Sequence, residues 1–145
     1  MPHLTLPISP GGPLIDLIVG VSAPRQAALQ KANQPVPPGI PARFLVDTGA
    51  SNTVIDPAIL NQLHLTPTGI MAAHTPSTAG VPQHIQQFDV SLAIAHATLT
   101  RYFHALPVAA CQLKIQGFDG LLGRDVLREC LLIYTGPDNA FILSI

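Results

Sequence analysis

Short runs in which apolar and polar residues alternate dominate the sequence, and they restrict the chain to a fold built mostly of strands. In residues 87–95 (QFDVSLAIA) the alternation places Phe88, Val90, Leu92 and Ile94 on one face. The 15 prolines lie mostly between such runs, where they favour turns. We therefore predict a mostly all-β fold. Comparable runs predict further strands at 14–22 and 42–48, one or two strands over 97–109, and a C-terminal hairpin over 130–145.

Helix signals are few and short. Asp56 followed by Pro57 is typical of a helix N-terminus and predicts one short helix that runs through Leu63. Residues 124–130 (RDVLREC) are the second candidate. Residues 25–32 have helical propensity, but the proline-rich sequence PVPPGIP follows them closely. We therefore expect an exposed loop over residues 23–41 instead of a third helix.

The composition fits one domain over residues 1–145. Hydrophobic residues make up 48% of the chain and charged residues only 10%, which does not suggest disorder. The formal net charge is -1, so the chain offers no basic patch for phosphates, and we expect no nucleic-acid partner. Its apolar runs are far shorter than a bilayer requires, so we expect no membrane partner either.

The N-terminal segment and the cysteines favour a reduced protein in the cytoplasm, and the histidines do not indicate a metal site. Residues 1–12 lack the basic and continuously apolar pattern of a signal peptide. Cys111 and Cys130 are too few for a disulfide framework and match no zinc spacing, although two thiols could pair in an exported protein. The six histidines show no metal-ligand spacing, so we expect neither a metal nor another cofactor.

Residues 44–51 (FLVDTGAS) carry an aspartate where an apolar strand ends. Small residues follow Asp47, and a second short strand is predicted at 53–55. Taken alone, Asp-Thr-Gly is a common kind of turn sequence. A carboxylate held on a tight loop between two strands is also suited to catalysis. The Asp-Thr-Gly triplet occurs once in the chain.

Two further segments share this mixture of apolar and turn residues. In residues 117–127 (GFDGLLGRDVL), two leucines precede Gly123, which lets the backbone and a following helix approach closely. Alone, this pattern indicates a helix start packed on a sheet. Residues 74–84 (HTPSTAGVPQH) predict a hairpin with its tip at residues 78–80, and alone they indicate an ordinary surface turn.

In this order, the three segments resemble the retroviral-type aspartic proteases (retropepsins) and their cellular and bacterial relatives. The sequence of residues 47–51 (DTGAS) matches the active-site loop, and residues 74–84 match the flap. Residues 121–124 (LLGR) match the apolar-apolar-Gly motif with its following arginine. The resemblance covers residues 14–145, and it implies a closed acid-protease barrel with aspartic endopeptidase activity and no metal.

The resemblance makes Asp47 the catalytic aspartate. The reaction needs one ionised and one protonated carboxylate on either side of a water molecule, but the chain supplies one such loop. The resemblance therefore implies a homodimer with two-fold symmetry, in which the same residue comes from both copies. Thr48 would lock the two loops together, and Gly49 would let the substrate backbone approach.

The same resemblance assigns a set of substrate contacts. Ala50 stands where pepsin-like enzymes usually place a hydroxyl that favours ionisation, so we expect a weakly acidic pH optimum. Ser51 stands where many retropepsins place an acid that pairs with the arginine, so Arg124 could bind Asp125, Asp119 or a backbone carbonyl instead. Leu45 and Val54 match apolar pocket positions, which implies a preference for extended, apolar-flanked peptides; the alternative for both residues is a place in the core. The predicted substrate-binding residues are Leu45, Ala50, Ser51, Val54, Thr78, Ala79, Gly80 and Leu122.

The chain ends are the predicted dimer strands. Residues 2–6 (PHLTL) and 141–145 (FILSI) are short and apolar, and unpaired strands of this kind invite association. The alternative for residues 141–145 is an inner strand of the chain's own sheet. Two alternatives to general proteolysis also remain open at this point: an idle dimeric peptide-binding domain, and a protease whose substrate is its own precursor or one partner.

Overall fold

Strands are the main regular structure of the computed structural model, which describes residues 2–74, 79–97 and 99–145. The strands are β1 (His3–Pro7), β2 (Leu14–Val21), β3 (Ile40–Val46), β4 (Val54–Ile55), β5 (Gly69–Ala73), β6 (Gln83–His96), β7 (Leu99–Ala110), β8 (Gly120–Leu122), β9 (Leu131–Thr135) and β10 (Ala140–Ser144). The helices are α1 (Ala23–Lys31), α2 (Pro57–Gln62) and α3 (Arg124–Leu127), with a 3₁₀ turn, η2 (Lys114–Gln116). The predicted mostly all-β class is confirmed.

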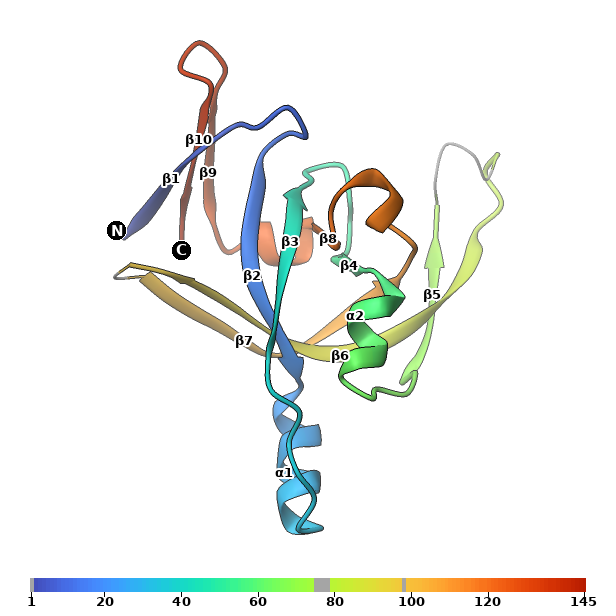
Figure 1. Ribbon diagram of the computed structural model, residues 1–145. Helices are drawn as coiled ribbons and strands as arrows, with labels where there is room; N and C mark the ends of the chain where they lie inside the picture. The colour runs from blue at the N-terminus through green and yellow to red at the C-terminus, as the bar shows by residue number, and fades with distance from the viewer. Residues whose placement is uncertain (1, 75–78, 98) are drawn as a thin grey trace.

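A closed barrel forms the body of the molecule (Figure 1). Its strands follow the order β2-β3-β8-β4-β7-β6-β5, and β2 also pairs with β6, which closes the ring and leaves β5 outside it. Alternate residues of β2, β3 and β6 point inward and fill the core, as Val90, Leu92 and Ile94 of β6 do at 0–1% exposure. Removing this apolar surface from water is the main driving force for the fold.

A smaller sheet ties the two ends of the chain together. Its strand order is β1-β10-β9, so β10 lies in the middle with a partner on each side. Phe141 and Leu143 of β10 are fully buried in the core. The prediction of an unpaired end strand over residues 141–145 is therefore wrong, and the alternative of an inner strand is the correct one.

The segment 23–41 requires a second correction, because it begins with helix α1. The buried Ser22 hydroxyl caps the helix by accepting a hydrogen bond from the Arg25 amide, and Pro24 fits the first turn, where no amide partner is needed. No residue of α1 is buried, and Figure 1 shows the helix projecting away from the barrel. The segment is exposed, as predicted, but it is helical over its first half.

The other two helices lie near their predicted positions. Asp56 caps α2 through a 2.9 Å hydrogen bond from the Ala58 amide to its carboxylate. Helix α3 begins at Arg124 and ends at Leu127, so it is shorter than the predicted range of 124–130. Cys111 and Cys130 are both free thiols.

Candidate active site

Three neighbouring strands position the Asp47 loop. Strand β8 lies between β3 and β4, parallel to β3 and antiparallel to β4. The Asp47 amide continues the β3–β8 pairing by donating a 3.1 Å hydrogen bond to the Leu122 carbonyl. Asp47 is thus held at the end of β3, and the loop from 48 to 52 returns the chain to β4.

The loop folds tightly around the Asp47 side chain. The Gly49 amide donates a 2.9 Å hydrogen bond to Asp47 Oδ1, and the Ala50 amide donates to the Asp47 carbonyl at 3.2 Å. A Cβ atom at Gly49 would lie 3.1 Å from Asp47 Oδ1, so a side chain there would crowd the carboxylate. Asp47 is half-buried, while Thr48 and Gly49 are exposed. The carboxylate is therefore fixed by its own loop and still open to a second molecule.

Arg124 fastens the outside of this loop. Its guanidinium donates to the Thr48 carbonyl at 2.9 Å and to the Ser51 hydroxyl at 3.0 Å, and its amide donates to the Ala50 carbonyl at 2.9 Å. The sequence left three kinds of partner open for Arg124, and the structure shows one of them, a backbone carbonyl. The Ser51 hydroxyl accepts a second hydrogen bond from the guanidinium, at the position where many retropepsins have an acidic residue. Asp119 instead accepts a 2.9 Å hydrogen bond from the Arg43 amide.

Half-buried apolar side chains lie in a row on the face of the sheet that Asp47 shares. Leu45 and Asp47 are two residues apart at the end of β3, so they point to the same side. Leu121 of β8 is the direct register partner of both Leu45 and Val54. Leu14 extends the row on β2, opposite Leu45. The sequence analysis named Leu45 and Val54 but missed the two leucines between and beside them.

Leu122 is a correction to the predicted set of substrate contacts. Its side chain is 0% exposed and belongs to the barrel core, so it cannot reach a peptide. The alternation along β8 instead turns the side chain of Leu121 to the Asp47 side. The signal that could have separated the two leucines is the register against β3, which a sequence alone does not give.

The β5–β6 hairpin is present where the flap was predicted. Its strands pair from Gly69 opposite Gln87 to Ala73 opposite Gln83. Ala79 and Gly80 are exposed turn residues with φ of 48° and 83°. Thr78, the third residue of the predicted tip, lies outside the described residues. Val81 is 68% exposed, which leaves an apolar side chain available near the tip.

A second carboxylate, Asp56, supports the base of this region without facing solvent. It is 5% exposed and accepts hydrogen bonds from the amides of Ala58, Leu113 and Lys114. Burial alone would raise its pKa, but these amides and the charge of Lys114 outweigh burial and hold the pKa below its ordinary value. Asp56 therefore stays ionised and joins α2 to the segment before β8.

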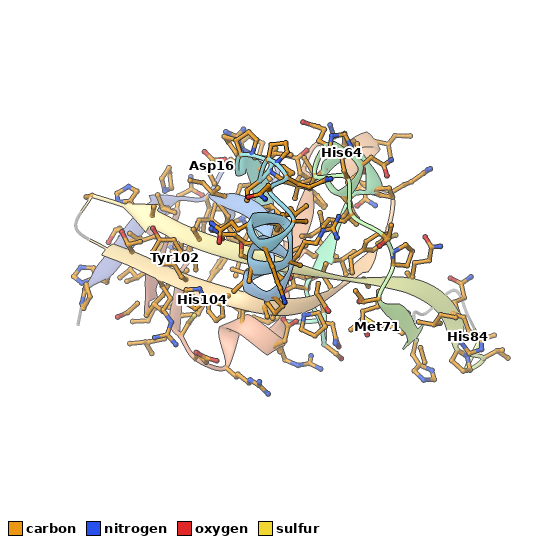
Figure 2. All side chains as sticks on the ribbon, turned by 90° about the horizontal axis from the view of Figure 1, so that it is seen from below. Asp16, His64, Met71, His84, Tyr102 and His104 are labelled. Carbon is orange, nitrogen blue, oxygen red and sulfur yellow. The ribbon has the colours of Figure 1, made fainter. Side chains whose placement is uncertain are left out.

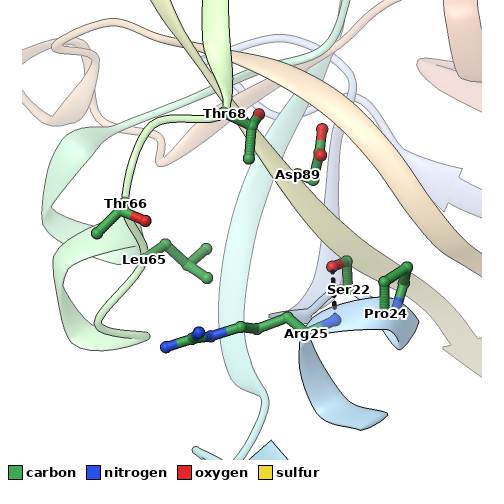
Figure 3. A pocket seen from close by; sticks show the side chains of 7 residues that line it. All are labelled: Ser22, Pro24, Arg25, Leu65, Thr66, Thr68 and Asp89. Carbon is green, nitrogen blue, oxygen red and sulfur yellow. Dashed lines mark hydrogen bonds between the residues drawn. The ribbon is translucent and has the colours of Figure 1, made fainter. Parts of the chain in front are cut away.

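Other parts of the described surface offer less chemistry. A cavity of about 290 Å³ lies between α1 and the segment before β5, with Arg25 and Asp89 among its lining residues (Figure 3). The labelled histidines His64, His84 and His104 lie well apart (Figure 2). Within the described ranges, no three His, Cys, Asp or Glu side chains gather closely enough to hold a metal ion. Likewise, none of the described helices has the length and apolar character needed to cross a membrane.

Comparison with known proteins identifies the class. Residues 37–126, more than half of the chain, match the model of a family described as "Aspartyl protease", so the chain belongs to the aspartyl protease family. No curated protein sequence matches the chain significantly. With the Asp-Thr-Gly loop described above, the family match makes the protein an aspartic-type hydrolase.

The fold is similar to that of a retropepsin-like aspartic protease. A solved retropepsin-like aspartic protease from Rickettsia conorii is similar over 98% of this chain and 90% of its own, with a TM-score of 0.61 and 16% sequence identity. The predicted family, the closed barrel and the enzyme class are therefore confirmed.

Proposed function

We propose that two copies of this chain form a symmetric aspartic endopeptidase whose paired Asp47 carboxylates activate one water molecule. The supporting observation is the state of Asp47 in a single copy. In the part of the chain that the structure describes, the Gly49 amide is the one recorded hydrogen-bond donor to this half-exposed carboxylate. A lone carboxylate lacks the proton donor that the reaction needs, and a second copy supplies it.

The proposed reaction divides two proton transfers between the carboxylates. The ionised Asp47 takes a proton from water, whose oxygen attacks the carbonyl carbon of the peptide bond. The protonated Asp47 of the other copy donates its proton to the carbonyl oxygen, which gives a neutral tetrahedral diol. Collapse of the diol breaks the C–N bond: the first Asp47 gives its proton to the leaving nitrogen, and the other Asp47 takes a proton from a diol hydroxyl, which becomes the carbonyl of the new carboxylic acid. Two carboxylates that share one water molecule cannot both ionise, so the pair holds one proton between them before attack.

The surroundings of Asp47 suit an extended peptide with apolar side chains. The row of Leu14, Leu45, Leu121 and Val54 borders Asp47 on the same face of the sheet. The exposed Gly49 and Ser51, with the half-buried Ala50 between them, leave room for a substrate backbone beside the carboxylate. In this proposal the β5–β6 hairpin covers the bound peptide, with the exposed Ala79, Gly80 and Val81 near its tip.

The small sheet at the chain ends also fits an interface between two copies, although through other strands than the one first predicted. Because β10 already has two partners, a second copy would add at the edge strands β1 or β9. Leu131 and Ile133 of β9 are 51% and 44% exposed, so this edge is the more apolar one.

A mixing experiment tests both the chemistry and the dimer. Wild type and Asp47→Asn are incubated with apolar-flanked peptides from pH 4 to 7, alone and mixed at constant total concentration. If both carboxylates of a dimer are required, the rate falls as the square of the wild-type fraction. A linear fall contradicts the shared site. No cleavage by the wild type, with peptides still bound, would favour the idle peptide-binding domain.

A further inference from the structure

The segment from Leu122 to Asp125 contacts the active-site loop along nearly its whole length. The Leu122 carbonyl binds the Asp47 amide at the start of the loop, and Arg124 binds the middle through Thr48, Ala50 and Ser51. Arg124 acts from outside, where its side chain is exposed. The end of the loop is held differently, by the neighbouring residue Asp125 on the inner side.

Asp125 uses both carboxylate oxygens on one buried residue, Thr53. Oδ2 accepts a 2.8 Å hydrogen bond from the Thr53 amide, and Oδ1 accepts one of 2.8 Å from the Thr53 hydroxyl. The same hydroxyl accepts a 3.2 Å hydrogen bond from the Gly123 amide. Thr53 is 0% exposed, so water cannot replace these partners. The Thr53 backbone therefore has one well-defined position.

This contact bears on Asp47 because the loop between them is short and closely packed. A Cβ atom at Gly123 would lie 2.5 Å from the Asn52 carbonyl carbon, so the loop backbone lies directly on the Gly123 backbone. The start of the loop is fixed at Asp47 and its end at Thr53. Movement of Thr53 must be taken up by the residues between, which include Gly49, the donor to the Asp47 carboxylate.

We infer that Asp125 is a positioning residue for Asp47: acting through Thr53, it fixes the far end of the active-site loop and so aligns the carboxylate. Asp125 itself bonds to Thr53 and to the Val126 amide, which keeps it in the supporting structure behind the loop. The inference rests on the proposed function, since alignment matters only if Asp47 reacts. Misplacement of a reacting group by about 1 Å can cost on the order of a hundredfold in rate.

Three variants and one control test the inference by steady-state kinetics. Thr53→Val removes the hydroxyl with little change in shape, whereas Thr53→Ser keeps it and removes a methyl group. Asp125→Asn keeps the shape but replaces one accepting oxygen with an amide that cannot accept. Asp16→Asn is the control, because Asp16 pairs with Arg43 on the exposed barrel wall. For each variant, kcat, KM, thermal midpoint and dimer content are measured.

We expect kcat to fall in the variants that weaken the hydrogen bonds between Thr53 and Asp125, and to be kept where the hydroxyl is kept. Thr53→Val should lower kcat about tenfold to a hundredfold with KM nearly unchanged, and Asp125→Asn about tenfold. Thr53→Ser keeps the hydroxyl, so it should keep most of the wild-type kcat even if its thermal midpoint falls as far as that of Thr53→Val. If Thr53→Val does not fold, the kcat of Asp125→Asn is compared with that of Asp16→Asn instead.

Three outcomes would overturn the inference, and the last of them would overturn the proposed function as well. If wild type cleaves but kcat of folded Thr53→Val and Asp125→Asn equals that of wild type, Asp125 does not position Asp47. The same holds if Asp16→Asn loses as much kcat as they do. If wild type cleaves no peptide and matches Asp47→Asn, the proposed function fails and the inference fails with it.

Discussion

The loop that carries Asp47 and the β5–β6 hairpin differ in how many kinds of contact stabilise them. The site floor, defined here as residues 47–56 with 119–125, is bound by amides, a guanidinium and carboxylates, and it encloses the buried Thr53 and Asp56. Strand β5 of the hairpin has no buried residue, and β6 becomes buried only from Phe88 onward. The hairpin is held by strand pairing, and the floor by strand pairing and side chains together.

This difference indicates a division of labour. Proton transfer requires fixed distances, and the floor supplies them through many short contacts. In the proposed function the hairpin covers the bound peptide, and an exposed hairpin with few core contacts can be displaced at low cost when a peptide enters. Substitutions in the floor should therefore change kcat and stability, whereas those in the hairpin should change KM.

The sharpest comparison uses one glycine from each region. In Gly123→Ala, the new Cβ would lie 2.5 Å and 2.6 Å from the carbonyl carbon and oxygen of Asn52, which are backbone atoms that cannot turn away. We expect a loss of about 1–3 kcal/mol in unfolding free energy and nearly complete loss of activity. The matched change in the hairpin, Gly69→Ala, meets only the Gln87 side chain at 3.8 Å. Denaturation and peptide cleavage should show the first variant disabled and the second nearly normal.

Asp56→Asn tests whether the floor depends on charge. An amide cannot accept from all three backbone amides, so we expect about 1–3 kcal/mol lower stability at pH 7. The folded pKa of Asp56 is lowered, so its stabilising contribution is complete above the unfolded value of about 3.9 and disappears as the pH falls through the folded pKa. Urea unfolding should show the gap between the two proteins narrowing below about pH 4. A gap that is constant with pH would contradict this.

Val81→Ser tests the hairpin with an expected effect on binding alone. Val81 is 68% exposed, so the substitution should leave unfolding free energy within about 0.5 kcal/mol of wild type. If this side chain covers bound peptide, KM should rise several-fold while kcat changes little. A fall in kcat with KM unchanged would place the hairpin in the chemical step and remove the distinction between the two regions.

The smallest effect is expected from removing α1. Replacing residues 23–37 with a short glycine-containing turn deletes a helix that has no buried residue. Cleavage should stay within about twofold of wild type, because the helix projects from the end of the barrel away from the Asp47 loop (Figure 1). A large loss would show that this arm takes part in substrate binding or pairing of copies.

Local sequence signals predicted the elements well where one face is buried. The alternation in β6 and the Asp56-Pro57 helix start both reflect contacts within a few residues. Helix α1 was missed because none of its residues is buried, so it shows no helical apolar period, and the following prolines suggested a loop. Ser22 and Pro24 did carry the correct signal of a helix start.

The parts of the site that sequence could not give depend on register between distant segments. The inner placement of β10, the outward face of Leu121 and the hydrogen bonds from Thr53 to Asp125 all join residues far apart along the chain. The Asp-Thr-Gly loop was found because its residues are contiguous. Of its supports, Arg124 was named through the family resemblance. The contact between Thr53 and Asp125 was not found, because neither residue belongs to a local pattern that marks the other.

The small sheet has a consequence for the connectivity of the fold. His3 lies opposite Ser144, and the Ser144 hydroxyl donates a 2.8 Å hydrogen bond to the Pro2 carbonyl, so the ends of the described chain are neighbours (Figure 1). A short peptide could join them, and new ends could be opened in the exposed segment after α1. Such a circular permutant should keep the barrel and the Asp47 loop intact.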